Sequence, residues 1–206
     1  MRAMPAAALS FVDLYRRFGR LAVLRGVSAR ITNGELLLVT GINGSGKSTL
    51  LKCLAGLLAP DRGQIEYREG EQLLETRERR LRVGYVAPDL ALYEELSVAE
   101  NLRFFARLRR VPAEPGLELA ARFGLPPERP AGALSSGMLQ RLRWSWALLH
   151  RPRLLLLDEP FQNLDEPGRQ TASQLIREHL ATGLAVVANP THLDLPDVSH
   201  RLNLAG

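Results

Sequence analysis

Residues 41–49 are Gly41-Ile42-Asn43-Gly44-Ser45-Gly46-Lys47-Ser48-Thr49, the pattern G-x-x-x-x-G-K-[ST] of a phosphate-binding loop. An apolar run of strand length, residues 35–40, precedes this loop, and residues 50–58 after it have the composition of a helix start. The alternative, a glycine-rich turn that meets the pattern by chance, is disfavoured because a strand and a helix flank the loop. The segment therefore predicts a nucleotide site.

The residue types of the loop explain the chemistry. Glycines allow a tight turn and bring backbone N–H groups close to a polyphosphate, while the helix N-terminus adds free donors and a favourable dipole. We expect Lys47 to reach the β- and γ-phosphates and to act in catalysis, and the Ser48 hydroxyl to hold Mg²⁺. All nine residues are therefore predicted to bind the phosphates of a nucleotide.

The composition is that of an ordinary globular protein. A length of 206 residues suits one domain, residues 1–206. No apolar run approaches the roughly 20 residues of a membrane span, and the N-terminal segment is too weakly apolar for a signal peptide. We therefore expect a cytosolic protein, in which the single Cys53 has a buried apolar role rather than a reactive one.

The net charge of +5 comes almost wholly from arginine, since Lys47 and Lys52 are the only lysines. Such an excess is compatible with nucleic acid or an anionic membrane face as a partner. Because positive charge more often forms an ordinary solvated surface, it carries little weight alone. Residues 68–82, which hold five of the arginines, are expected to form a solvated loop or short helix.

Apolar periodicity predicts an α/β fold, a mainly parallel sheet with helices on both faces. Residues 9–15 are predicted to form an edge strand and residues 21–31 a second strand of a small β layer. Buried strands are expected at 83–87, 154–157 and 184–187. Residues from about 92 to about 145 look like a helical insertion, which opens at a capping box, Ser97 to Glu100. Its first helix is expected to carry Leu102, Phe105 and Leu108 on one face.

Two acidic residues follow the apolar strand 154–157. An Asp158 at this position lies at the carboxyl end of a parallel strand, where ligands bind in open α/β sheets. It is placed to hold Mg²⁺ opposite Ser48, and the adjacent Glu159 is the natural group to orient and deprotonate an attacking water. The alternative is that the two acids cap the next helix.

Phe18 and Tyr15 are candidates to stack on a nucleobase, with ordinary sheet packing as the alternative for either.

The order of these motifs resembles that of the ATP-binding-cassette (ABC) ATPases over nearly the whole chain. The segments that carry the resemblance, besides the loop, are Leu134-Ser135-Ser136-Gly137-Met138, Leu154-Leu155-Leu156-Leu157-Asp158-Glu159-Pro160 and Asn163-Leu164-Asp165. The resemblance implies a P-loop NTPase core and a head-to-tail homodimer that encloses two ATP molecules. Ser135 and Gly137, at a helix N-terminus, would then offer donors to the γ-phosphate bound by the partner.

Several positions depart from the family pattern. Ser136 and Met138 replace a glycine and a glutamine of the signature. Asp89 takes the position of a glutamine that touches Mg²⁺ and the transport partner. His192 is the candidate for the family histidine at the γ-phosphate, although the slot could fall one or two residues earlier, and a surface-loop histidine is the alternative. Phe18 best fits the adenine-stacking slot.

The resemblance implies an ATPase subunit on the inner face of the cell membrane that drives a separate membrane permease. Segments 100–106, 135–138 and 158–161 are similar to the haem-exporter ATPase subunit of cytochrome c biogenesis, although other exporter ATPases share most of these features.

One alternative is a soluble cassette ATPase acting on nucleic acid or ribosomes. It is disfavoured because such proteins commonly carry two cassettes or a coiled-coil insertion, so no nucleic-acid partner is expected. Another is a nucleotide-gated subunit with weak turnover, suggested by Asp89 and His192.

Overall fold

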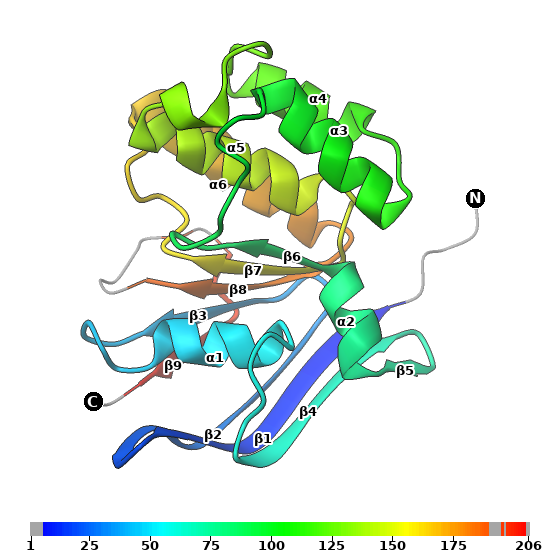
Figure 1. The fold of residues 1–206 in the computed structure, drawn as a ribbon. Helices are drawn as coiled ribbons and strands as arrows, with labels where there is room; N and C mark the ends of the chain where they lie inside the picture. The colour runs from blue at the N-terminus through cyan, green and yellow to red at the C-terminus, as the bar shows by residue number, and fades with distance from the viewer. Residues whose placement is uncertain (1–5, 190–194, 196, 205–206) are drawn as a thin grey trace.

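The computed structural model describes residues 6–189, 195 and 197–204. Figure 1 shows a layered arrangement in which a parallel sheet separates helix α1 (Lys47–Leu54) and an antiparallel sheet from the helices α3 to α6. This confirms the predicted α/β class with a small antiparallel layer and a helical insertion. Among the described residues, none of the helices is long and apolar enough to cross a membrane.

The parallel sheet has the strand order β6-β7-β8-β3-β9, and all four pairings are parallel. Its strands are β6 (Val83–Val86), β7 (Leu154–Asp158), β8 (Leu184–Ala188), β3 (Leu36–Thr40) and β9 (His200–Asn203). The central three are buried at every residue, as expected for apolar runs covered on both faces. The edge strand β9 was not predicted, because its residues are mostly polar and exposed.

The antiparallel sheet has the order β2-β1-β4-β5 and combines segments from both sides of the phosphate-binding loop. Its strands are β1 (Ala7–Phe18), β2 (Leu21–Thr32), β4 (Arg62–Glu69) and β5 (Gln72–Leu74). The prediction of an edge strand at 9–15 was wrong, because β1 pairs with β2 on one side and with β4 on the other. The alternation of polar and apolar residues in β1 does not reveal the second pairing, because its partner β4 lies some 50 residues later in the chain.

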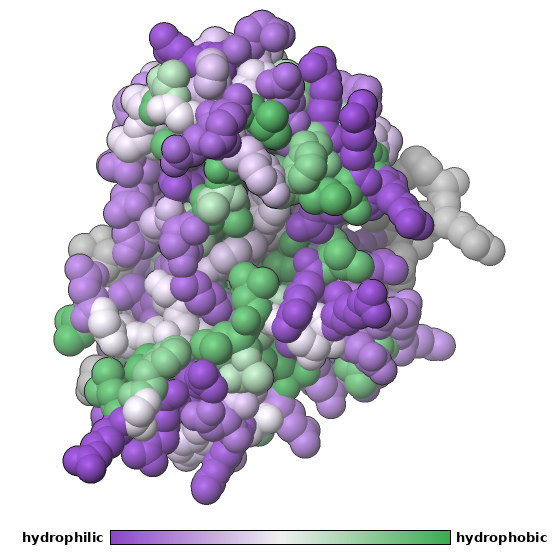
Figure 2. All heavy atoms as spheres, viewed as in Figure 1, coloured by the Kyte–Doolittle hydropathy of each residue, from purple (hydrophilic) through white to green (hydrophobic). Residues whose placement is uncertain are grey.

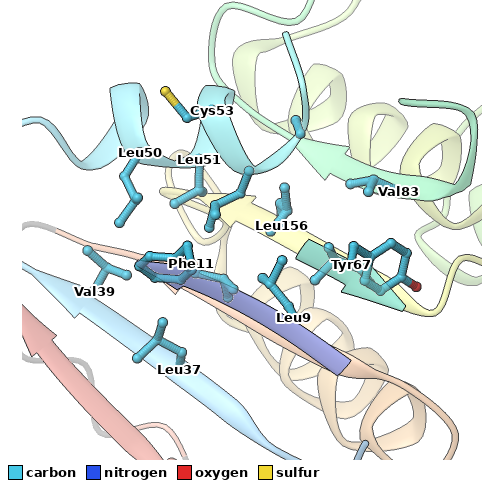
Figure 3. Close-up of a cluster of buried hydrophobic side chains, with 14 of the residues drawn as sticks. Leu9, Phe11, Leu37, Val39, Leu50, Leu51, Cys53, Tyr67, Val83 and Leu156 are labelled. Carbon is cyan, nitrogen blue, oxygen red and sulfur yellow. The ribbon is translucent and has the colours of Figure 1, made fainter. Parts of the chain in front are cut away.

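Two apolar clusters cover the two faces of the parallel sheet. On one face, shown in Figure 3, side chains of α1 and of β1 pack on alternate residues of β3 and β7, among them Leu50, Phe11, Leu37 and Leu156. On the other face lie α5 (Ser136–Leu148), α6 (Glu166–Leu180) and part of α3 (Val98–Arg109). Cys53 belongs to the first cluster, and burial raises the pKa of its thiol to about 11, as expected for an apolar role.

The helical insertion consists of α3, α4 (Glu114–Arg122), the 3₁₀ turn Ala131–Ala133 and the start of α5. The buried face of α3 differs from the predicted one, since Leu108 is 64% exposed while Val98, Leu102 and Ala106 are buried.

Segment 68–82 forms the end of β4, strand β5 and helix α2 (Thr76–Arg82). Arg79 in α2 is only 4% exposed, so the segment is less solvated than predicted.

The predicted capping box at the start of α3 is confirmed. The Ser97 hydroxyl accepts a hydrogen bond from the backbone N–H of Glu100 at 3.2 Å, and the Glu100 carboxylate accepts one from Ser97 N–H at 2.8 Å. Next to it, the side chain of Asn101 donates to the carbonyls of Tyr93 and Leu96 and accepts from Tyr93 N–H. The chain that leaves the parallel sheet is thereby fixed to the first turn of α3.

Ser97→Ala is expected to lower the free energy of unfolding by about 1 kcal/mol, since an N-terminal donor of α3 loses its acceptor. For a chain of this length the melting temperature should fall by about 2–4 °C. Glu100→Gln is the control, because glutamine also serves at this position of a capping box. Equal unfolding curves for wild type and Ser97→Ala in urea would contradict the role of the cap.

Candidate functional site

The phosphate-binding loop connects the carboxyl end of β3 to the first residue of α1. Gly44 and Gly46 have φ angles of 83° and 100°, in the left-handed region that glycine adopts at little cost. A Cβ atom at Gly46 would lie 2.7 Å from the Val23 side chain, so the loop also needs a glycine there for space. These two requirements explain the glycines at positions 44 and 46 of the pattern.

This cleft has a volume of about 320 Å³ and brings together three separate parts of the chain. Its lining includes Phe18 at the end of β1, Val23 of β2, Glu159 after β7, and the loop residues Asn43, Gly44, Gly46, Lys47, Ser48 and Thr49. The Phe18 ring is half exposed, and the Arg16 guanidinium lies 5.0 Å from its centroid. Of the two candidate aromatics, therefore, Phe18 lies at the loop, whereas Tyr15 lines a different hollow beside β4.

Lys47 is almost fully buried within the loop. Its ammonium donates hydrogen bonds to the carbonyl oxygens of Gly41, at 2.7 Å, and Ile42, at 2.9 Å. The loop thus folds around its own lysine and holds the positive charge at the floor of the cleft. The buried hydroxyl of Ser45 has no hydrogen-bond partner among the described residues, so the loop retains unused polar capacity.

Asp158 ends β7 and is 3% exposed. Burial raises the pKa of its carboxyl, the hydrogen bond with the Ser48 hydroxyl lowers it, and the nearby charge of Glu159 raises it. Its Oδ1 atom has no hydrogen-bond partner among the described residues. A hydroxyl and a carboxylate with free acceptor capacity are the hard oxygen ligands that Mg²⁺ prefers. Ser48 and Asp158 therefore fit a magnesium ion.

Glu159 lies at the rim of the same cleft with a φ angle of 47°, in the left-handed region, which is unfavourable for a residue with a side chain. Its backbone N–H donates to the Ala188 carbonyl at 2.9 Å, and its carboxylate accepts from the Gln162 side-chain amide at 3.1 Å. Gln162 was not identified from the sequence; its place three residues after Glu159, in a turn, was the available signal. The carboxylate is thus held in a defined orientation beside the loop.

The signature residues are connected to the acidic pair through α5. Ser135 caps α5 and accepts from Met138 N–H at 3.3 Å. Farther along α5, the side chains of Gln140 and Trp144 both donate to the carbonyl of Pro160, at 3.1 and 3.0 Å. Among the described residues that line the cleft, however, none belongs to the signature. Ser135 and Gly137 are therefore outside the cleft of their own chain.

The two remaining predicted positions have different outcomes. Asp89 forms an ion pair with Lys52 of α1 at 2.6 Å, and both side chains are partly exposed. Lys52 lies one helical turn after Ser48, so the pair connects α1 with the segment that follows β6. The Asp89 carboxylate would therefore have to leave its ion pair with Lys52 before it could coordinate a metal ion through the same oxygen. His192 lies outside the described residues.

Comparisons with known proteins agree with this geometry. Residues 24–162 match the family model described as ABC transporter. The chain is 36% identical over 207 residues to the cytochrome c biogenesis ATP-binding export protein CcmA 2 of Cupriavidus metallidurans, covering 98% of this chain and 97% of that protein. It is 37% identical over 184 residues to the sulfate/thiosulfate import ATP-binding protein CysA of Caulobacter vibrioides. That match covers 84% of this chain but only 54% of CysA, so the chain spans about half the length of this relative.

Among solved structures, the fold is similar to one described as the ATP-binding subunit of an ABC transporter. The TM-score is 0.78 at 28% identity, and the match covers 88% of this chain and 79% of the other.

Gly137→Ala is expected to destabilise the protein by about 1–3 kcal/mol, the usual range for overpacking. A Cβ atom at this position would lie 2.6 Å from the carbonyl oxygen of Asn163, whose own backbone has a φ of 60°. Ser136→Ala, one residue earlier and exposed, is the control. Unfolding in urea measures both variants, and equal or greater stability of Gly137→Ala, the usual result of glycine replacement in a helix, would contradict the contact.

Proposed function

The chain belongs to the ABC transporter family of ATP-hydrolysing subunits, and we propose that it powers export through a separate membrane permease, with haem for cytochrome c biogenesis as the cargo. The observation that carries the ATPase part is the cleft that joins the loop with Glu159, together with Asp158, which is hydrogen-bonded to Ser48 of the cleft lining. Binding, metal coordination and water activation each have a residue of suitable chemistry in or directly behind this lining. The proposed place of action is the cytoplasmic face of the membrane.

In the proposed reaction, ATP binds with its phosphates on the backbone N–H groups of residues 41–49. Lys47 exchanges its two loop carbonyls for the β- and γ-phosphates, and Phe18 stacks on the base. Ser48 and Asp158 would hold the magnesium ion, which neutralises charge on the phosphates when bound. Glu159, oriented by Gln162, accepts a proton from the water that attacks the γ-phosphate.

We further propose that the site is completed by a second copy of the chain. Ser135 and Gly137 lie at the N-terminus of α5 yet outside their own cleft, so their donors are free to face the γ-phosphate held by a partner. The helix dipole favours the negative charge of that phosphate. His192 and Asp89 are proposed as further contacts, to the γ-phosphate and to the metal ion respectively.

The permease is proposed to dock at an aromatic cluster where the chain enters the helical insertion. Tyr93 contacts the rings of Phe104 and Phe105, with centroids 4.9 and 5.9 Å apart, and Phe105 contacts Trp146. Tyr93 is 48% exposed and Leu108 is 64% exposed. Figure 2 shows apolar side chains gathered around α3 on this face. Tyr93 of this cluster follows Asp89 closely in the chain, which supports a route from permease to nucleotide.

The proposed direction and cargo depend on which relative the whole chain resembles. The match to the cytochrome c biogenesis export protein covers both chains almost completely, whereas only about half of the import protein CysA is covered. This supports export.

The arrangement of the arginines does not support a nucleic-acid partner. Several are ion-paired within the chain, including Arg16 with Asp61, Arg82 with Glu69, and Arg141 with Asp165. Another, Arg122, binds both carboxylate oxygens of Glu178 at 2.9 and 3.0 Å. These carboxylates balance part of the arginine charge within the chain, so the net charge of +5 is not by itself support for a nucleic-acid partner.

Glu159→Gln is expected to reduce ATP turnover by about 10²–10⁴-fold, the usual worth of a general base. ATP binding should persist, so size-exclusion chromatography with ATP should reveal a stable dimer. Glu118→Gln, on the exposed side of α4, is the control and should keep wild-type turnover. Turnover of Glu159→Gln at the wild-type rate would refute the proposed water activation.

Deletion of the gene in its host is expected to abolish haem-stained c-type cytochromes, because haem would no longer be exported for their assembly. Wild-type protein should restore them, and Glu159→Gln should not. Sulfate uptake, measured in the same strains, serves as the control and should be unaffected. Normal cytochromes together with impaired sulfate uptake would overturn the proposed direction and cargo while leaving the ATPase intact.

A further inference from the structure

Two buried polar side chains near the carboxyl edge of the β6–β7 pair each carry an oxygen atom without a hydrogen-bond partner among the described residues. Tyr85 is 6% exposed and Asp158 is 3% exposed. Neither the Tyr85 hydroxyl nor Asp158 Oδ1 has a hydrogen-bond partner among the described residues. A buried polar atom left unsatisfied costs about 1–3 kcal/mol, so two of them in one place indicate a ligand that both can bind.

The strand register brings the two side chains to one face. Tyr85 of β6 lies opposite Leu156 of β7, and Asp158 is two residues farther along. Because side chains alternate along a strand, Tyr85, Leu156 and Asp158 all point to the side covered by α1. Tyr85 and Asp158 are thus diagonal neighbours on adjacent parallel strands, close enough for the negative charge of Asp158 to act on the Tyr85 hydroxyl. Figure 3 shows Leu156 on this side beneath Leu50 and Leu51 of α1, the helix that also carries Ser48.

The electrostatic surroundings keep the hydroxyl protonated. Burial, followed by the negative charges of Asp158 and Asp89, raises the pKa of Tyr85 well above its ordinary value. The phenol is therefore a hydrogen-bond donor at any physiological pH, whereas Asp158 offers acceptors. Among the groups around Asp158, Lys52 forms an ion pair with Asp89, the Ser48 hydroxyl is hydrogen-bonded to Asp158, and Glu159 adds a second negative charge.

We propose that Tyr85 is a positioning residue of the magnesium site, whose hydroxyl donates to the metal ion's water shell beside Asp158. Mg²⁺ usually keeps several waters and takes only one or two protein ligands, so the waters need partners from the protein. A phenol donor next to a carboxylate acceptor supplies such a partner. Groups that orient a metal site from behind its ligands typically contribute 10–100-fold to metal affinity. The inference rests on the proposed ATPase function, which supplies the metal ion.

The test compares Tyr85→Phe with Tyr67→Phe. Each change removes one hydroxyl from a buried tyrosine and keeps the ring, but the Tyr67 hydroxyl donates to Glu69 at 3.0 Å in the antiparallel sheet, outside the cleft. Mn²⁺ serves as the probe, titrated by electron paramagnetic resonance into protein loaded with one equivalent of a non-hydrolysable ATP analogue. The affinity for a fluorescent ATP analogue is measured separately in EDTA.

Tyr85→Phe is expected to bind Mn²⁺ roughly 10–100-fold more weakly, with unchanged nucleotide affinity in EDTA. It should fold as well as wild type, because the change removes an unpaired hydroxyl. Tyr67→Phe should leave both affinities unchanged. Wild-type Mn²⁺ affinity in Tyr85→Phe would overturn the proposal, and so would an equal loss of both affinities, which would indicate a purely structural role. If wild type bound no nucleotide at all, the proposed function itself would fail, a result separate from either outcome.

Discussion

The register of three buried parallel strands is the constraint on which the site depends. Val39 of β3 pairs with Ala188 of β8, and Ala188 pairs with Asp158 of β7. These three residues therefore lie in one row across the sheet, with the phosphate-binding loop leaving β3 two residues later and Glu159 leaving β7 directly. Since a slip of one residue would turn every side chain to the opposite face, the apolar packing on both faces fixes this row. The position of the carboxylates relative to the loop is thus set by packing of the core.

Much of this arrangement was predictable because its signals are local. The loop pattern, the apolar runs of the central strands and the acids at the end of β7 each occupy fewer than ten consecutive residues. Parallel strands present their carboxyl ends at one edge, so the meeting of the loop with Asp158 and Glu159 follows from the strand assignment alone. The capping box at Ser97 was likewise predictable, because both of its hydrogen bonds join residues three apart.

The features that the sequence did not reveal depend on contacts between distant segments. The central place of β1 requires β4, and the pairing of Asp89 with Lys52 joins residues 37 apart. Arg79 is buried because its guanidinium lies near the carbonyl of Ile65 in β4, to which it donates, while the charge density of its segment indicated solvent. Leu108 follows the helical period of a buried face, yet α3 is covered by α4 and α5 only along its other residues. In each case a tertiary contact, absent from any local pattern, decides the outcome.

Several unfavourable features of the described residues lie at the phosphate-binding loop and at the carboxyl ends of β6 and β7. Glu159 has a left-handed backbone, Asp158 Oδ1 and the hydroxyls of Tyr85 and Ser45 are buried without partners among the described residues, and the ammonium of Lys47 is held by carbonyls of its own loop. The segment after β7 is held by hydrogen bonds from Gln140 and Trp144 to the carbonyl of Pro160, one residue after Glu159. A bound nucleotide with its metal ion offers these polar groups the partners that the protein does not supply. Binding therefore stabilises the native state by mass action, and it does so at the same row of residues that the core packing holds in place.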